Sequence, residues 1–165
     1  MKKIIFVRHG KAEDPGPGFS DFERSLTSKG KNISRLMAVK LKEKENSLGA
    51  IVTSPAFRAM ETALIFAGVY GAAPEKIIIN SNLYFNIDQN SFMDILRNTS
   101  EDIDTVTLFG HNPSFTDLPE LLGKESSEIL PKSGIICLSF KTKTWSGINR
   151  NTGNADYFLK PKKTL

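Results

Sequence analysis

The sequence predicts an α/β protein in which helices cover both faces of a central sheet. Short, unbroken apolar runs at residues 4–7 and 50–53 are typical of strands that are buried on both faces. Stretches with helical periodicity follow these runs, and such alternation favours parallel strands. Apolar runs near the end of the chain follow one another without a helix. We therefore expect a three-layer sandwich with a mixed, mostly parallel sheet, formed by a single domain over residues 1–165.

The first helix and the second helix are predicted from their capping residues. A loop rich in proline and glycine follows strand 4–7 and extends to about residue 25. Thr27 is expected to cap a helix that continues to about residue 46. After strand 50–53, Ser54 is expected as the N-cap, with Pro55 as the first residue of a helix to about residue 70.

The second half of the chain continues the alternation and then ends in a meander of strands. Its apolar runs are separated by only two stretches with helical character. Strands are expected at 77–79, 105–109, 134–140, 144–148 and 155–159, and helices at 92–97 and 113–122.

Composition excludes several classes of protein. The net charge is +4, but the lysines are spread along the chain and form no dense basic arm, so we expect no nucleic-acid partner. The apolar run at residues 4–7 is too short for a secretory signal, and no stretch is long enough to span a membrane. The one cysteine, Cys137, is expected to be a buried, small apolar residue. A cytoplasmic protein is the expectation. Because no helix shows a wide exposed apolar face, we also expect a monomer.

The chain has only two histidines, and each follows an apolar run beside a glycine. The first lies in Arg8-His9-Gly10. A neutral imidazole is a competent nucleophile at phosphorus, and a neighbouring guanidinium matches the oxygens of phosphate. Gly10 would permit a sharp turn and leave room for the phosphoryl group. The alternative is a surface turn with a solvated arginine and a packed histidine.

Two further motifs follow two other predicted strands. Arg58 lies one turn into the helix after Ser54, where anions are favoured, although a surface ion pair with Glu61 or Glu23 is the alternative. His111 and Asn112 leave strand 105–109 just before a helix. His111 can donate to a phosphate oxygen, or it can be a core histidine bonded to a carbonyl. Since ligands bind at the carboxyl ends of strands in an open α/β sheet, phosphate chemistry is the first hypothesis.

Together the motifs resemble a known family. The chain is similar to the histidine phosphatases of the phosphoglycerate mutase superfamily, and most of all to the small SixA-type phosphohistidine phosphatases. The order of Arg-His-Gly, Ser-Pro-x-x-Arg-Ala and Gly-His-Asn-Pro is highly specific, and the stretch Asp21-x-x-Arg24-x-Leu26-Thr27 points to the SixA branch. The similarity runs nearly end to end, through residues 7–12, 20–27, 53–63, 82–84 and 110–113, the Trp145 region and Pro161.

The resemblance implies a fold and roles for the residues. The fold would be phosphoglycerate mutase-like, and His9 would be the nucleophile that becomes phosphorylated. Arg8, Arg58 and His111 would hold and stabilise the transferring group, with Gly10 and Asn112 also contacting the substrate. No metal and no cofactor are expected, because two guanidinium groups supply the positive charge.

The leaving group decides between substrates. Larger members of the family carry an acidic residue after the third strand, whereas here only Asp88 lies in that stretch and Asp21 lies in the early loop. Both are candidates for a general acid, although Asp21 can instead pair with Arg24. A phosphohistidine leaving group carries its own proton near neutral pH. The expected substrate is therefore a phosphohistidine protein, such as a histidine phosphotransfer domain. The alternatives are a phosphatase of sugar or nucleotide phosphates and a binding module without turnover.

Overall fold

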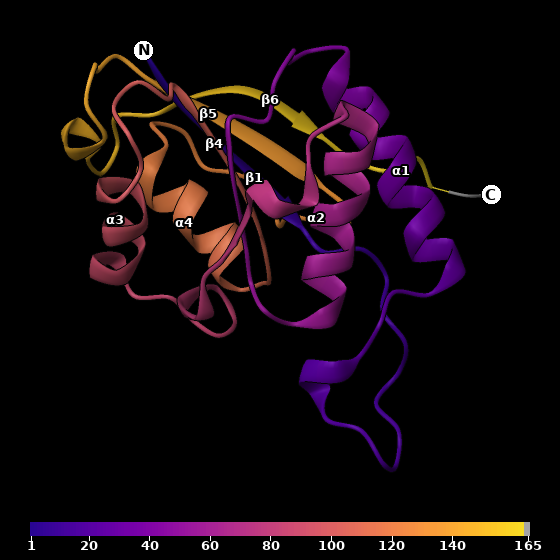
Figure 1. Cartoon of the computed structure of the whole chain (residues 1–165). Coiled ribbons are helices and arrows are strands. Elements are labelled where there is room, and N and C mark those ends of the chain that lie inside the picture. Colours follow the sequence, from indigo (N-terminus) through magenta and orange to yellow (C-terminus); the bar gives the residue numbers. More distant parts are fainter. Residues whose placement is uncertain (164–165) are drawn as a thin grey trace.

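The computed structural model describes residues 1–163 and contains one six-stranded sheet with the strand order β3-β2-β4-β1-β5-β6 (Figure 1). The first four strands of that order run parallel, β5 is antiparallel to β1, and β6 is antiparallel to β5. The prediction of a mixed, mostly parallel sheet is confirmed. The strands are β1 (Lys2–Arg8), β2 (Ala50–Thr53), β3 (Ile77–Ile79), β4 (Thr105–Gly110), β5 (Ile135–Phe140) and β6 (Asn154–Leu159).

Helices cover both faces of this sheet, as predicted, and side chains of β1 alternate between the two layers. Ile4 and Phe6 point into the core under α3 and α4, where the Phe6 ring lies 5.5 Å from the Phe115 ring. Ile5 and Val7 face the other core, under α1 and α2. Figure 1 shows the two helix pairs on opposite sides of the sheet. The helices are α1 (Ser28–Lys42), α2 (Phe57–Tyr70), α3 (Gln89–Arg97) and α4 (Ser114–Leu122).

The register of the sheet brings three strand ends together. In the strand order, β4 lies between β1 and β2, with Arg8 opposite Gly110 and Thr53 opposite Phe109. The ladder continues just beyond the strands, because the backbone amide of His9 donates to the Gly110 carbonyl at 3.0 Å. The residues that follow β1, β2 and β4 therefore start side by side.

The start of α2 differs from the prediction. The helix begins at Phe57, with Ala56 rather than Ser54 as its N-cap. Ser54 instead stays next to the sheet, where its Oγ accepts from the Ala56 amide at 3.3 Å and contacts a ring nitrogen of His111 at 2.7 Å. The competing bond to His111 explains why the serine is not the cap. The end of α1 also comes earlier than predicted, at Lys42.

The strand predicted at 144–148 is wrong. The segment is a 3₁₀ turn, η4 (Trp145–Gly147), and Trp145 is fully buried. Its indole nitrogen donates to the Ser100 carbonyl at 3.2 Å, and the buried Lys2 ammonium lies 4.9 Å above its ring. The apolar residues at 144–148 are therefore explained by one buried aromatic side chain, Trp145, and not by a strand.

Helix α1 carries some exposed apolar surface. Leu36 and Val39 are 64% and 46% exposed, which bears on the expectation that no helix has a wide exposed apolar face. The monomer remains a prediction. Within residues 1–163, none of the helices is both long and apolar enough to cross a membrane.

Candidate active site

The two histidines lie next to each other at the ends of β1 and β4. Their ring centroids are 5.0 Å apart, and each side chain belongs to a residue that is only 7% exposed. The Nδ1–H of His9 donates to the carbonyl of Gly10 at 2.7 Å. Because this bond fixes the proton on Nδ1, the lone pair of the neutral ring is on Nε2. His9 therefore presents the nitrogen that a nucleophile needs.

Both imidazoles are held in the neutral form. Burial, helped by the nearby His111, Arg58 and Arg8, lowers the pKa of His9 to about 3, although the bond to Gly10 opposes this shift. Burial and the Arg58 charge lower the pKa of His111 to about 4, whereas Asp21 opposes this shift. Neutral rings at pH 7 keep the lone pair of His9 available.

His111 is oriented by Ser54. The Oγ of Ser54 accepts from the Ala56 amide, so its own proton is free to bond the Nε2 of His111 at 2.7 Å. In that arrangement the proton of His111 lies on Nδ1. This Nδ1 is buried and has no hydrogen-bond partner among the described residues. The expected alternative, a histidine bonded to a carbonyl, is not what the structure shows.

Arg8 is partly tied to the segment before β5. Its Nη1 donates to the Leu130 carbonyl at 2.9 Å, and the side-chain Nδ2 of Asn112 donates to the same oxygen at 3.0 Å. Burial lowers the pKa of the Arg8 guanidinium. Its Nε is buried and, within residues 1–163, has no partner. Arg8 therefore keeps a donor that nothing in the described chain satisfies.

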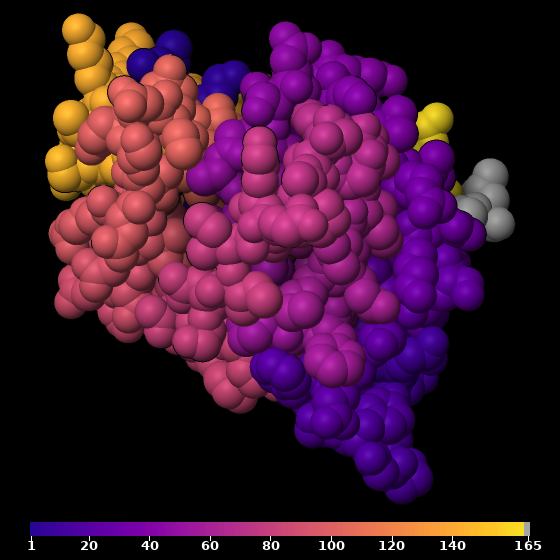
Figure 2. All heavy atoms as spheres, viewed as in Figure 1, coloured from indigo at the N-terminus to yellow at the C-terminus, as the bar shows by residue number. Residues whose placement is uncertain are grey.

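Arg58 meets Asp21, which comes from the long loop between β1 and α1. Its Nη1 donates to the Asp21 carbonyl at 2.7 Å, and its Nη2 donates to the Asp21 carboxylate at 3.0 Å. Arg58 is 7% exposed, so the alternative of a surface ion pair with Glu61 or Glu23 is wrong. The loop that supplies Asp21 extends from the rest of the chain at the bottom of Figure 1, and forms a lobe in the space-filling view (Figure 2).

Asp21 is the centre of a small polar network. Besides Arg58, it accepts from Arg24 at 2.8 Å and from the Tyr84 hydroxyl at 3.0 Å. Burial alone would raise its pKa, but the bonds from Arg24, Tyr84 and Arg58 together lower it to about 2. The pairing with Arg24 predicted from sequence is confirmed, and the carboxylate is ionised at neutral pH.

The structure gives the contacts of two other predicted residues, Asp88 and Gly10. Asp88 is exposed and caps α3, where it accepts from the amide and the hydroxyl of Ser91 at 3.0 and 2.7 Å. The amide of Gly10 donates to Thr62 Oγ1 at 3.1 Å, and a Cβ on Gly10 would lie 2.6 Å from Ser34 Oγ. A glycine is therefore required where the segment after β1 passes close to α1. That Gly10 also leaves room for the phosphoryl group stays a prediction.

Sequence reasoning missed part of the surroundings of the site. The Tyr84 ring lies 5.8 Å from the His111 ring and 5.2 Å from the Phe22 ring. Tyr84 belongs to the stretch 82–84 that carried the family resemblance, so that resemblance was the available signal. No local sequence signal predicted that the Leu130 carbonyl accepts hydrogen bonds from Arg8 and Asn112, because these bonds join distant parts of the chain. Within residues 1–163, no three His, Cys, Asp or Glu side chains lie together as metal ligands would.

Comparisons with known proteins agree with this geometry. The sequence model of the histidine phosphatase superfamily (branch 1) matches residues 4–83, which include His9 and Arg58. A solved structure of the protein histidine phosphatase SixA complexed with tungstate matches with a TM-score of 0.81 and 25% identity, over 96% of this chain and 97% of that one. The chain belongs to the histidine phosphatase superfamily. Its resemblance to the SixA-type branch covers the phosphoglycerate mutase-like fold from end to end.

Other relatives of this histidine phosphatase are more diverse. A protein of Picosynechococcus sp. with no characterised function is 30% identical over 99% of this chain and 98% of its own. The mycobacterial glucosyl-3-phosphoglycerate phosphatase in complex with VO3 has a TM-score of 0.64 and 13% identity, over 95% of this chain and 98% of that one. The last likeness concerns the fold alone. Family membership, together with the likeness to SixA, makes the protein a phosphatase, a hydrolase of phosphate esters.

Proposed function

We propose that this histidine phosphatase removes phosphate from phosphohistidine on a protein, through a covalent intermediate on His9. One observation carries the proposal. The ring of a buried, neutral His9 keeps Nε2 free and lies 5.0 Å from the ring of His111, and two buried donors of these neighbouring residues, Arg8 Nε and His111 Nδ1, have no partner in the described chain. Unpaired buried donors cost free energy, and an anion that binds between them and His9 would remove that cost.

The reaction would take place in two balanced steps. In the first, Nε2 of His9 forms a bond to phosphorus while the bond from phosphorus to the substrate imidazole breaks. The substrate ring leaves as a neutral imidazole, because its other nitrogen already carries a proton. In the second step, water attacks the phosphorus of phospho-His9, the Nε2–P bond breaks, and inorganic phosphate leaves. The backbone carbonyl of Gly10 holds the Nδ1 proton throughout.

The surrounding hydrogen-bond donors, two of them cationic, would stabilise the charge on the equatorial oxygens. Arg8 and Arg58 contribute two guanidinium groups, and His111 contributes the proton on Nδ1. Arg58 must then share its fork between Asp21 and the phosphoryl group, since two of its nitrogens already bond Asp21. A guanidinium has five N–H donors, which is enough for both partners.

The lack of a suitable acid supports the phosphohistidine substrate. Asp21 is ionised, with a pKa of about 2, and Asp88 caps a helix. His111, with a pKa of about 4, is neutral at pH 7 and therefore offers no imidazolium proton. An alkyl phosphate needs a proton on its leaving oxygen, whereas phosphohistidine does not. A small-molecule phosphatase remains the second candidate, which the likeness to the glucosyl-3-phosphoglycerate phosphatase supports at the level of fold alone.

A leaving-group series tests the proposal. The wild type and Asp21→Asn are assayed on a phosphorylated histidine phosphotransfer domain, aryl phosphates and sugar phosphates. We expect kcat/KM on the phosphohistidine domain to exceed that on sugar phosphates by about 100-fold or more, the size of a general-acid contribution. Rates on esters should fall steeply as the leaving-group pKa rises, in both proteins. A flat dependence in the wild type that becomes steep in Asp21→Asn would identify Asp21 as a general acid and favour the small-molecule substrate.

A further inference from the structure

A strongly basic groove adjoins the candidate active site. It has a volume of about 570 Å³, and no acidic residue is among the described residues that line it. The net charge of the whole chain is only +4, so positive charge is concentrated here. Its basic lining residues are Arg8, Lys11, Lys29, Lys132, Lys160, Lys162 and Lys163.

Most of these charges are not neutralised within the chain. Lys160 pairs with Glu128. Five other lysines of the groove are exposed and form no ion pair among residues 1–163, namely Lys11, Lys29, Lys132, Lys162 and Lys163. Like charges gathered in one concavity repel one another and raise the local concentration of anions. The groove is therefore suited to an acidic partner.

The groove is connected to the strand end that carries His9. Arg8 itself is one of its lining residues. Ser133, another lining residue, donates its amide to the carbonyls of Arg8 and His9, each at 3.1 Å. The groove therefore reaches the strand end that carries the proposed nucleophile, although His9 itself is not among its lining residues.

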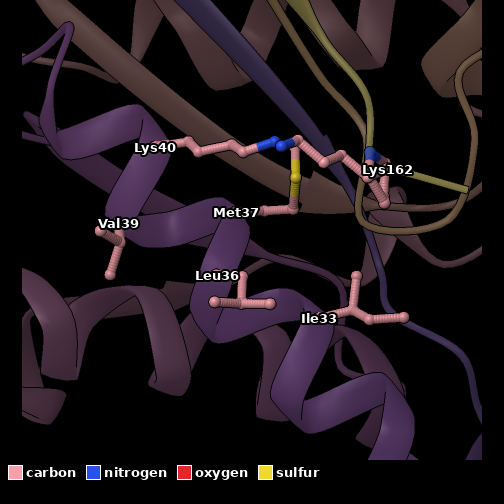
Figure 3. A pocket seen from close by; sticks show the side chains of 7 residues that line it. Ile33, Leu36, Met37, Val39, Lys40 and Lys162 are labelled. Atoms are coloured by element: carbon pink, nitrogen blue, oxygen red, sulfur yellow. The ribbon is translucent and has the colours of Figure 1, made fainter. Parts of the chain in front are cut away.

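An apolar groove of about 410 Å³ continues this surface along α1 (Figure 3). The two grooves share Ile33, Pro161 and Lys162. Leu36, 64% exposed, and Val39, 46% exposed, contribute apolar surface. In Figure 3 the side chains of Lys40 and Lys162 point toward one another across Met37. Two ammonium groups that converge over an apolar wall favour an anionic group between them.

We propose that the two grooves together dock an acidic, amphipathic helix of the phosphorylated protein substrate, an inference that rests on the function proposed above. A phosphate ester of a small molecule would fill only the end at Arg8. An acidic helix with an apolar stripe would satisfy the lysines and cover Leu36 at the same time. A nucleic acid backbone would contact the lysines but leave the apolar groove uncovered, and a flat membrane surface does not enter a concave groove.

Charge reversal distant from the reacting atoms tests this surface. The double variant Lys132→Glu/Lys162→Glu is compared with Lys141→Glu/Lys143→Glu, which changes two exposed lysines outside both grooves. The substrates are a phosphorylated histidine phosphotransfer domain with an acidic helical face, and phosphoimidazole. We expect kcat/KM on the domain to fall about tenfold or more in the groove variant, mainly through KM, and about twofold or less on phosphoimidazole. The control variant should resemble the wild type on both substrates.

The apolar part of the surface has its own variant. Leu36→Asp should also weaken turnover of the domain and leave phosphoimidazole hydrolysis within about twofold, because the residue is exposed and outside the reacting centre. Added salt should reduce the wild-type rate on the domain and flatten the difference from the groove variant.

Three results would overturn the docking proposal. Equal losses on both substrates would mean that the variant damages the site itself. Equal losses in the groove and control variants would indicate that the domain is attracted by the overall positive charge of the protein and not by the groove. Unchanged turnover of the domain, together with lost binding of phosphatidylglycerol vesicles or a single-stranded oligonucleotide, would assign the groove to those partners. A wild type that does not hydrolyse the phosphorylated domain would refute the proposed function instead.

Discussion

At the scale of single residues, the two imidazoles of the candidate site use their nitrogens in opposite ways. His9 donates a hydrogen bond from Nδ1 to a backbone carbonyl and keeps Nε2 free. His111 instead accepts a hydrogen bond at Nε2, and its Nδ1 has no partner among the described residues. One ring is therefore arranged as a nucleophile and the other as a donor. The difference arises from the immediate neighbours, Gly10 in one case and Ser54 in the other.

Arg58 gives a prediction at the same scale. Arg58→Lys should lower kcat/KM by about 10²–10³-fold, because an ammonium cannot replace a planar fork that bonds Asp21 with two nitrogens and phosphate with others. Steady-state kinetics with an aryl phosphate measures the loss. Arg35→Lys, on the exposed surface of α1, is the matched control and should behave as the wild type. A near-normal rate for Arg58→Lys would remove Arg58 from the phosphate site.

At the scale of elements, strand ends were predictable and their surroundings were not. Apolar runs located β1, β2 and β4, and the rule for open sheets placed His9 and His111 at one edge. Ser54 was assigned as a helix cap because a cap is a local pattern, but a long-range bond to His111 decides its position. Trp145 misled the strand prediction for the same reason, since its burial depends on Lys2 and Ser100, far away in the sequence.

The contact between α1 and the segment after β1 supplies a prediction on stability. Gly30 lies so close to this segment that a Cβ would be 2.1 Å from the carbonyl oxygen of Lys11. Gly30→Ala should lower the free energy of unfolding by about 1–3 kcal/mol or more, because backbone would have to move. Gly68→Ala on α2, where a Cβ meets nothing within 4 Å, is the control and should be neutral or stabilising by about 0.5–1 kcal/mol.

Denaturant unfolding of both variants measures the difference. If Gly30→Ala were as stable as Gly68→Ala, α1 would not be packed against the Lys11 backbone as described. Since Lys11 follows the Arg8-His9-Gly10 turn, Gly30→Ala should also slow turnover, whereas Gly68→Ala should not.

At the scale of the whole molecule, the buried histidines link stability to pH. Their folded-state pKa values, about 3 for His9 and about 4 for His111, lie below the value of about 6.5 expected in the unfolded chain. Between about pH 4 and 6.5 the unfolded state therefore binds more protons than the folded state. The free energy of unfolding is thus highest above pH 6.5 and decreases as the pH is lowered through that window. Each imidazole contributes a slope of about 1.4 kcal/mol per pH unit at most.

The free energy of unfolding measured from pH 7.5 to 4.5 tests this link. His111→Asn removes one of the two groups and should reduce the slope by about half. Proton NMR of the two imidazoles gives a direct readout, since the chain has no other histidine. Neither ring of the folded protein should titrate between pH 8 and about 5.5. A midpoint near 6.5 for either ring would contradict the burial that keeps it neutral.

The central claim is that His9 becomes phosphorylated, and trapping of the phosphoenzyme tests it most directly. The wild type, His9→Ala and His111→Ala are mixed briefly with substrate that carries radiolabelled phosphate, quenched and digested. The account predicts an acid-labile, base-stable label on His9 in the wild type, slower labelling of the same residue in His111→Ala, and no label in His9→Ala. A label retained by His9→Ala, or found on another residue of the wild type, would contradict it.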